Sequence, residues 1–358
     1  MRQAGLFGLS DHLKRLSAYG DPLEELGLIV DFEVFRPTLV AALAYGDGAK
    51  GGRPPYDPVA MLKVLILAAQ NNVADARMEY LIRDRLSWLR FLGFDLGVAT
   101  PDANTIRLFR EKLAEAGALD ALFADFDRQL KERGYLAMGG QIVDATLVAA
   151  PKQRNTADEK AAIKEGKTAG EIWPDEPARA AQKDTDARWT LKFAKGRPMP
   201  DGKPGIDIAI PSFGYKSSIS ICQTFGFIRK CKVTDGARFD GRMLRDAVTN
   251  DNTASDVWAD TAYRSQANEK WLKAQGRVSR IHRKKPRGKP MPDHVRRGNA
   301  TKSKVRARVE HVFAQQKAKM GLFIRTIGIK RAEAKITLAN LAYNMNRLIF
   351  HERRAATG

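Results

Sequence analysis

The sequence has little of several features that would assign it to a particular class of protein. It holds only two cysteines, Cys222 and Cys231, without the paired Cys or Cys/His spacing that binds zinc, so we expect reduced, buried thiols. The most apolar stretch, residues 59–69, is interrupted by Lys63 and is too short to span a bilayer. The first ten residues lack the long apolar core of a signal peptide. We therefore expect a cytoplasmic protein with no membrane partner.

Acidic residues are also few relative to basic ones. The 358 residues include 61 Lys and Arg against 41 Asp and Glu, which gives a formal net charge of +20. Between Arg277 and Arg308, thirteen residues are basic and only Asp293 is acidic. Such a run repels itself unless a polyanion neutralises it. This clustering favours nucleic acid as a partner over the alternative of a basic protein whose lysines only keep it in solution.

Residues 1–135 are predicted to be helical. Asp57 followed by Pro58 is typical of a helix start, and the apolar residues that follow indicate a helix central to a bundle. The spacing predicts a second amphipathic helix over residues 78–91 and a third that begins at residues 100–102.

Basic residues lie on the polar face of that third helix, where Arg107 and Arg110 are candidate DNA contacts. Short helices with basic outer faces suit a helix-turn-helix-like domain for DNA binding or dimerisation. A plain helical bundle with solvated arginines fits the same pattern, because periodicity does not tell which face meets DNA.

From residue 136 to residue 358 the order of predicted elements changes to α/β with one mixed sheet and flanking helices. The predicted strands are residues 141–148, 213–221, 225–233, 256–259 and 278–282. The predicted helices are residues 242–249, 266–275, 304–320 and 331–351. Residues 151–205 form a polar insert without a sustained period, which predicts a long loop, and residues 283–303 are predicted to be a basic loop.

Three acidic residues stand in local settings that favour a catalytic role. Asp144 lies within an apolar run that predicts a buried strand, and Asp260 ends a second short strand. Glu310 lies within a segment of helical period. Two strand carboxylates and one helix carboxylate, brought together by a fold, would form an all-oxygen site for two Mg²⁺ ions, with Mn²⁺ as a substitute. In a cationic protein such a site points to phosphodiester chemistry on nucleic acid.

The residues around Glu310 strengthen that interpretation. Arg306 precedes it by one helical turn and Lys317 follows by about two turns, so the three share one stripe of a helix. A surface ion pair on a solvated helix would have the same spacing. Val309 and Val312 form an adjacent apolar stripe that would bury the helix and place Glu310 at the edge of the buried face.

These residues resemble the transposases of bacterial insertion sequences, specifically the insertion sequence 5 family. The resemblance covers Asp144 in Val-Asp-Ala-Thr, Asp260 in Ala-Asp-Thr-Ala-Tyr-Arg-Ser and Glu310 in Arg-Val-Glu-His-Val-Phe. The family signature Y-x-x-R-x-x-x-E-x-x-x-x-x-x-K is met except at its tyrosine, where this chain has Ser303. The resemblance implies an RNase H-like fold of the retroviral integrase type, with a D-D-E metal triad.

The resemblance also implies a reaction and its partners. Water attacks the phosphodiester at each transposon end, and the freed 3′-hydroxyls then attack target DNA. Asp144, Asp260 and Glu310 would hold the metal ions, and Arg306 and Lys317 would lie near phosphate. The partners implied are double-stranded DNA, both transposon ends and target, and further copies of the chain in a homodimer or larger assembly. The cellular setting implied is the bacterial nucleoid.

Further candidate DNA contacts lie outside the triad: Lys216 in a predicted strand, Trp189 as a ring that stacks on an unpaired base, and the basic run Arg283, Lys284 and Lys285. A solvated strand lysine is the simpler interpretation of Lys216. Two other functions remain open at this point. One is a catalytically silent DNA-binding protein that keeps the fold, and the other is a stand-alone two-metal DNA nuclease.

Overall fold

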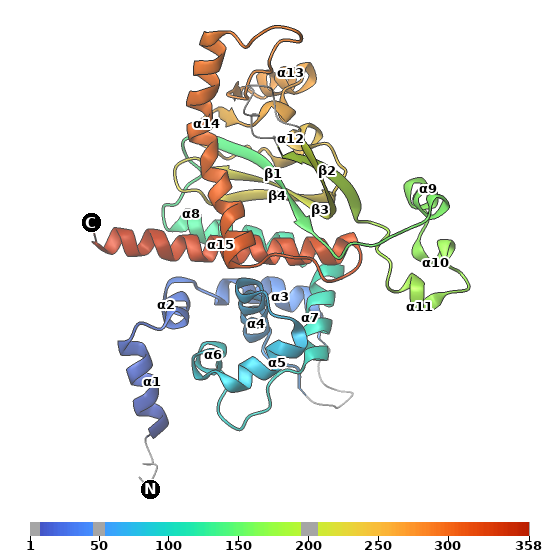
Figure 1. The fold of residues 1–358 in the computed structure, drawn as a ribbon. Helices are drawn as coiled ribbons and strands as arrows, with labels where there is room; N and C mark the ends of the chain where they lie inside the picture. Colours follow the sequence, from blue (N-terminus) through green and yellow to red (C-terminus); the bar gives the residue numbers. More distant parts are fainter. Residues whose placement is uncertain (1–7, 46–53, 195–206, 358) are drawn as a thin grey trace, which may run out of the picture. The chain divides into compact units, whose positions relative to one another are not determined.

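The structure is a computed structural model that describes residues 8–45, 54–194 and 207–357 (Figure 1). The chain divides into two compact units. Unit 1 comprises residues Met1–Leu136, Ala318–Gly321 and Thr337–Gly358, and unit 2 comprises Ala137–Lys317 and Leu322–Ile336. Within the described ranges, no helix combines the length and the apolar character needed to cross a membrane.

Unit 1 is built from helices. They are α1 (Gly8–Ala18), α2 (Pro22–Ile29), the 3₁₀ turn η1 (Glu33–Phe35), α3 (Arg36–Leu43), α4 (Pro58–Asn71), α5 (Asp75–Asp84), α6 (Leu86–Leu92), α7 (Ala103–Glu115), α8 (Ala118–Glu132) and the part of α15 (Ile329–Thr357) that begins at Thr337.

The predicted central helix of unit 1 is confirmed as α4. Its N-cap residue Asp57 accepts hydrogen bonds at 2.9 Å from the backbone N–H groups of Val59 and Ala60, which satisfies two donors of the first turn. Pro58 occupies the first helical position. Almost every apolar residue from Val59 to Ala69 is buried, which makes α4 the core of the bundle.

The prediction of one helix over residues 78–91 is wrong. The chain is extended at Arg85 (φ −110°, ψ 110°), so α5 ends at Asp84 and a separate helix, α6, begins at Leu86. The break changes the direction of the chain and buries Trp88 and Leu89. Both helices are amphipathic and the helical spacing of apolar residues continues from one into the other. The sequence pattern therefore does not reveal the break.

Unit 2 contains a six-stranded sheet. Its strands are β1 (Gln141–Ala149), β2 (Arg188–Ala194), β3 (Ile208–Cys222), β4 (Ile228–Asp235), β5 (Asp256–Trp258) and β6 (Val278–Ser279). Its helices are α9 (Ala157–Glu165), α10 (Ala169–Ile172), α11 (Pro177–Ala180), η2 (Asp240–Met243), α12 (Leu244–Ala247), η3 (Thr261–Tyr263), α13 (Gln266–Ala274) and α14 (Asp293–Ala314). Unit 2 also includes the π-helical turn η4 (Gln315–Lys319) as far as Lys317, and α15 as far as Ile336.

The topology of the sheet is that of RNase H. Strand β3 pairs antiparallel with β1 and with β4, while β5 pairs parallel with β1, and β6 pairs parallel with β5. The spatial order β4-β3-β1-β5-β6 therefore joins an antiparallel meander to a parallel half, with β1 in the centre. β2 adds a further strand along the first residues of β3. The predicted mixed α/β, RNase H-like fold class is confirmed.

A close approach of backbone to backbone fixes the start of the central strand. Gly140 has φ +91°, and a Cβ atom built there would lie 2.6 Å from the carbonyl oxygen of Asp256. Asn252 holds the same glycine from the other side, because its side chain accepts from Gly140 N at 2.9 Å and donates to Gly140 O at 2.8 Å. Glycine at this position thus lets β1 begin directly beside β5.

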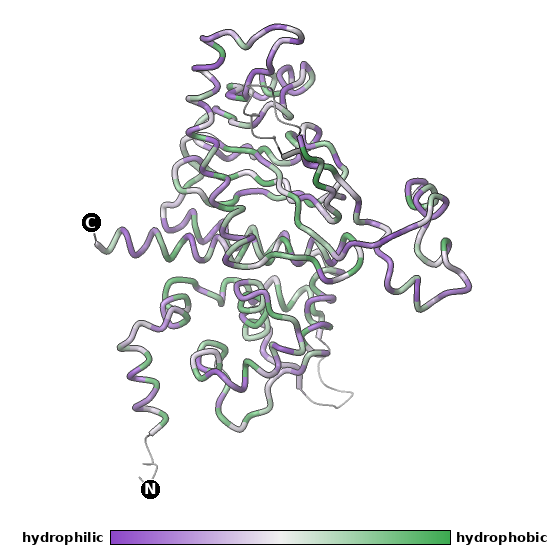
Figure 2. The backbone as a smooth tube through the Cα atoms, viewed as in Figure 1, coloured by the Kyte–Doolittle hydropathy of each residue, from purple (hydrophilic) through white to green (hydrophobic). Residues whose placement is uncertain are grey.

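Two predicted loops of unit 2 are wrong in part. In its described part, residues 151–194, the polar insert is not one long loop, since it contains α9, α10, α11 and the strand β2; residues 195–205 lie outside the described residues. The basic loop at residues 283–303 ends early, because α14 begins at Asp293 directly after Pro292. Figure 2 shows mainly hydrophobic colouring along β1, and mainly hydrophilic colouring in the insert and in the segment that leads into α14.

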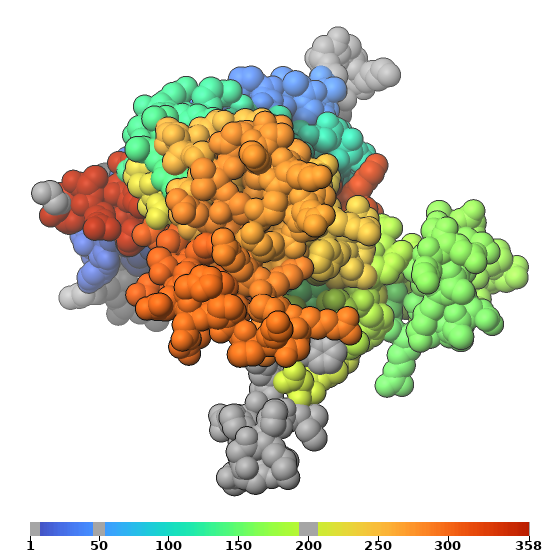
Figure 3. Space-filling view, turned by 90° about the horizontal axis from the view of Figure 1, so that it is seen from above, coloured from blue at the N-terminus to red at the C-terminus, as the bar shows by residue number. Residues whose placement is uncertain are grey.

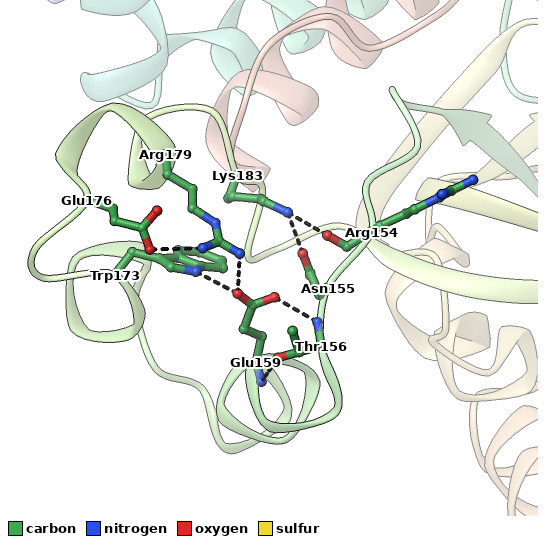
Figure 4. Close-up of polar contacts among 8 residues, drawn as sticks. All are labelled: Arg154, Asn155, Thr156, Glu159, Trp173, Glu176, Arg179 and Lys183. Atoms are coloured by element: carbon green, nitrogen blue, oxygen red, sulfur yellow. Dashed lines mark hydrogen bonds and ion pairs between the residues drawn. The ribbon is translucent and has the colours of Figure 1, made fainter.

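The short helices of the insert are held by one carboxylate (Figure 4). Glu159 accepts hydrogen bonds from Thr156 N at 2.8 Å, Trp173 Nε1 at 2.9 Å and Arg179 Nη2 at 2.5 Å. The Trp173 side chain is buried beneath these contacts. At the neck of the insert, the buried Tyr215 hydroxyl donates to Asp184.

Candidate active site

Asp144 lies in the middle of β1, opposite Ile219 of β3. Its side chain is only 14% exposed, and one oxygen, Oδ1, accepts a hydrogen bond from Ala145 N at 2.8 Å. A central strand flanked by strands on both sides is the most rigid platform of this fold. The predicted strand setting of this carboxylate is confirmed, and the second oxygen, Oδ2, is directed to α14 through Arg306.

Asp260 follows β5, the strand that runs parallel to β1. It caps the 3₁₀ turn η3, because its Oδ1 accepts from Ala262 N at 2.8 Å. The capping bond fixes the carboxylate at the end of the sheet to which the parallel strands run. Sequence reasoning assigned this strand end correctly from the short run that precedes Asp260.

Arg306 joins two of the three predicted carboxylates. It lies on α14, which packs on β1 and β5. Its Nη1 atom donates to Asp144 Oδ2 at 2.6 Å, and its Nη2 atom donates to Glu310 Oε1 at 2.5 Å. A residue of the central strand and a residue of α14 thus share one guanidinium, while the Glu310 side chain remains 58% exposed at the edge of the buried helix face.

The charge of this cluster is only partly compensated. Burial raises the pKa of Asp144 to about 6, against lowering by the Ala145 N–H group and by Arg306. The negative charges of Asp260 and Asp240 raise it further. These carboxylates are therefore near enough for each to disfavour ionisation of Asp144, which is the electrostatic setting that a divalent cation relieves.

A buried hydroxyl group lies in the same field. Tyr263, at the end of η3, is fully buried, and its hydroxyl has no hydrogen-bond partner within the described part of the chain. Burial and the charges of Asp144, Asp240 and Asp260 hold the pKa of this phenol well above its usual range.

The donor set of carboxylate oxygens fits Mg²⁺ or Mn²⁺. As the side chains stand, no group of three acidic, His or Cys side chains in the described ranges is arranged to hold a metal ion, and Arg306 occupies the space between Asp144 and Glu310.

Two family models match the chain, and together they span most of its length. Residues 136–345 match the model described as a transposase DDE domain, which alone covers more than half of the chain. Residues 11–112 match a transposase domain, DUF772. The chain belongs to the DDE transposase family. No solved structure matches it. A DNA transposase acts on DNA, and DDE domains generally depend on divalent metal ions.

Asp240 is a residue near the carboxylate cluster that sequence reasoning missed. It begins η2, and its Oδ1 accepts from Lys216 Nζ at 2.7 Å. Lys216 also donates to the carbonyl oxygen of Arg238, so this predicted DNA contact is held within the protein. Nothing in the sequence singles out Asp240, because only the fold brings it near β1.

Lys317 lies against β1 on the side of Thr146. Its Nζ atom donates to Thr146 Oγ1 at 2.5 Å. Burial lowers the pKa of Lys317, and the positive charge of Lys192 lowers it further. The predicted stripe of Arg306, Glu310 and Lys317 begins as one face of α14, but Lys317 falls within the π-helical turn η4, which shifts its direction.

Ser303, which stands where the family signature has tyrosine, lies beside a histidine. Its Oγ atom is 3.4 Å from His282 Nε2. His282 follows β6, and its backbone N–H group donates to Ala259 O at 3.1 Å, beside the strand end that carries Asp260. Burial, Arg306 and Lys302 lower the pKa of His282, while Asp260 opposes them. Sequence reasoning missed this histidine, which carries no motif of its own.

The remaining predicted DNA contacts of unit 2 are exposed. Trp189 lies in β2 rather than in a loop; it is 40% exposed and packs its ring against Phe213 at 5.3 Å between centroids. Arg283, Lys284 and Lys285 are exposed in the segment that leads to α14. The main chain of Arg283 is fixed, since its N–H and C=O groups both hydrogen-bond the side chain of Asn299.

In unit 1, the two predicted arginine contacts are both paired. Arg110 donates two hydrogen bonds to Asp75, at 2.8 Å and 2.6 Å, and so links α7 to α5. Arg107 donates to Glu111 at 2.6 Å and to Asn104 at 2.6 Å on α7 itself. Arg107 is the more exposed of the two, with 45% of its side chain accessible against 19% for Arg110.

Proposed function

We propose that this DDE transposase cleaves the ends of its transposon and joins the freed 3′-hydroxyls to target DNA by two-metal-ion phosphoryl transfer. The observation that supports this proposal is the guanidinium of Arg306, which lies between Asp144 of the central strand and Glu310 of α14. Asp260 raises the pKa of Asp144, so the third carboxylate lies in the same electrostatic cluster.

The proposed ligands are Asp144, Asp260 and Glu310, which would hold two Mg²⁺ ions, with Mn²⁺ as a substitute. The ions would activate the attacking oxygen and stabilise the leaving oxygen of an in-line displacement. In the first step, an oxygen of water bonds to phosphorus and the 3′-oxygen leaves. In the second step, that 3′-hydroxyl bonds to a phosphorus of the target and displaces its 3′-oxygen. Asp144, paired with β3 in the central strand, would fix the position of the reacting phosphate.

Arg306 and Lys317 are proposed to contact phosphate. Arg306 is bonded to two carboxylates, so it must release at least one of them when a cation and a phosphodiester enter the site. Its planar fork then offers paired N–H donors to phosphate oxygens. Lys317 donates to Thr146 of β1, so its ammonium group lies beside the strand that carries Asp144.

DNA recognition is proposed to involve residues 1–135 and a second copy of the chain. The basic faces of these helices, with Arg107 exposed on α7, would bind the terminal inverted repeats. Residues 136–358 would then carry the chemistry. Two transposon ends require two active sites, so a homodimer or larger assembly would act at the bacterial nucleoid.

The test is a cleavage and joining assay with duplex DNA that carries one end of the element. With Mg²⁺, the wild-type chain is expected to nick the end and to join it to target DNA. The variant Asp144→Asn is expected to lose both products while it still binds the end. Nicked ends without joined products would favour a stand-alone nuclease, and binding without any product from the wild-type chain would favour a catalytically silent DNA-binding protein.

A further inference from the structure

Unit 2 carries an open groove outside the carboxylate cluster. It has a volume of about 820 Å³ and lies between the start of α13 and the segment that follows β6. We call it the Arg264 groove; its lining includes Arg264, Gln266, Glu269, Lys270, Arg283 and Lys284. Figure 3 shows α13 and α14, in orange, on the face of unit 2 that is turned to the viewer. The volume suits a stretch of polymer backbone more than a single ion.

The lining of this groove is strongly cationic. Four of the six residues named carry a positive charge, and only Glu269 is acidic. Glu269 is already engaged, since it lies 3.4 Å from Arg264 and accepts a hydrogen bond from Ser279 at 2.9 Å. Lys270 and Lys284 are exposed, and among the described residues their side chains form no hydrogen bond or ion pair. Most of the positive charge in the groove is therefore not neutralised by the protein.

Two cations of the groove, Arg264 and Arg283, also act on Lys302, a residue of α14 outside the lining. Burial lowers the pKa of Lys302, and the positive charges of Arg264, Arg283 and Arg280 lower it further. Lys302 is held in place all the same, because its Nζ atom donates to Ile281 O at 3.0 Å. Positive charges held this close together repel one another, and a bound polyanion would offset that repulsion.

The groove adjoins the carboxylate cluster along two elements. Arg264 ends the 3₁₀ turn η3 that begins directly after Asp260. Lys302 lies four residues before Arg306 on α14, which is about one helical turn. A backbone that lies in the groove can therefore continue toward Asp260 and Arg306 without leaving this face of unit 2.

We propose that the Arg264 groove binds successive phosphates of the DNA strand that leads into the carboxylate cluster. The ligand is recognised by its backbone charge alone, because the lining offers cations and few groups that would read a base. The inference rests on the proposed function for the claim that the bound DNA strand continues into the carboxylate cluster. Binding in the groove itself requires no catalysis. The groove therefore contributes affinity and position rather than sequence specificity.

The salt dependence of DNA binding tests this proposal. Each phosphate neutralised by a Lys or Arg contributes about 0.9 to the slope of log affinity against log salt. The full-length variant Lys270→Gln/Lys284→Gln is expected to bind an arbitrary DNA duplex more weakly, with a slope shallower by about 1.8 than that of the wild type. The measurement is fluorescence anisotropy over a series of NaCl concentrations without divalent metal.

A matched variant separates local contacts from total charge. Lys160→Gln/Lys164→Gln removes the same charge from exposed positions of α9 and is expected to leave the slope unchanged. An unchanged slope in the groove variant, or an equal loss in both variants, would overturn the proposal. Asp144→Asn is expected to keep the wild-type slope. If Asp144→Asn loses cleavage but the groove variant keeps the wild-type slope, the groove proposal is rejected and the proposed catalytic function stands.

Discussion

Arg306 Nη1 lies 2.6 Å from Asp144 Oδ2, although 162 positions separate the two residues in the sequence. The contact joins α14 to the central strand, and the same guanidinium reaches Glu310. The positive charge between the two carboxylates offsets their mutual repulsion, although the Glu310 side chain stays 58% exposed. The two hydrogen bonds keep the side chains of Asp144 and Glu310 aligned on one guanidinium.

The first prediction concerns Arg306. We expect Arg306→Gln to lower the rate of strand cleavage by about 100-fold, because a neutral amide neither aligns the two carboxylates nor stabilises charge on phosphate. The measurement is single-turnover cleavage at saturating DNA. Arg308→Gln is the control, since Arg308 lies two residues further along α14 and donates to the carbonyl oxygen of Gln223 rather than to a carboxylate of the cluster. Equal rates for the two variants would contradict the assigned role of Arg306.

The second prediction follows from the raised pKa of Asp144. A carboxyl with an ordinary pKa of 3.8 in the unfolded chain and about 6 in the folded chain stabilises the fold only while it is protonated. This contribution is complete below pH 3.8 and is lost as the pH rises through 6. The metal-free wild type should therefore lose about 2 kcal/mol relative to Asp144→Asn between pH 4 and pH 7.

Chemical denaturation in the presence of a chelator checks this difference. The free energy of unfolding of Asp144→Asn minus that of the wild type should increase with pH over this interval. The control is Asp235→Asn, at the end of β4, whose carboxylate accepts a hydrogen bond from Ala237 N at 2.8 Å; for this variant the difference should not increase with pH. If the difference for Asp144→Asn stays flat or falls with pH, the pKa of the Asp144 carboxyl is not raised in the folded chain.

The third prediction concerns the insert. Glu159→Gln should weaken three hydrogen bonds to one partly buried carboxylate, with a cost of about 1–3 kcal/mol to the local fold. Faster amide hydrogen exchange over residues 156–183 is the expected readout. Glu176→Gln is the matched control, because the Glu176 side chain is 54% exposed and pairs with Arg179 at the surface of the same insert. No difference in exchange between the two variants would reject Glu159 as the centre of this small fold.

The fourth prediction concerns the C-terminal helix. The buried residues of α15 that belong to unit 1 include Leu338, Leu341, Ala342, Met345 and Leu348. A chain that ends at residue 336 should therefore lose the fold of unit 1 and expose its apolar core. A chain that ends at residue 351 keeps all of these side chains and should stay folded, since the lost ion pair joins a half-buried Glu25 to an Arg353 that is 63% exposed. Circular dichroism and dye binding to exposed apolar surface distinguish these outcomes.

The central part of the fold could be predicted from sequence because its signals are local. The apolar run around Asp144 predicts a buried strand wherever it packs, and Asp57-Pro58 starts α4 through contacts within one turn. Arg306 and Glu310 share a helix face because of their spacing alone. These features need no knowledge of distant residues.

The rest depends on tertiary contacts that the sequence does not encode locally. Helices α9 to α11 are too short for a periodic signal and are stabilised by Glu159 and Trp173. Helical spacing places Arg110 on a polar face, but it does not show that the side chain is paired with Asp75 within the protein. Asp240 reaches the site only because η2 follows β4 in the folded sheet, and no motif marks it.

The most direct test of the account is the binding of Mn²⁺ by the full chain, measured by isothermal titration. The wild type is expected to bind, and Asp144→Asn, Asp260→Asn and Glu310→Gln are each expected to lose most of the binding heat. Asp240→Asn should retain it, because Asp240 is bonded to Lys216. If any of the three variants binds Mn²⁺ as the wild type does, Asp144, Asp260 and Glu310 do not form one metal site.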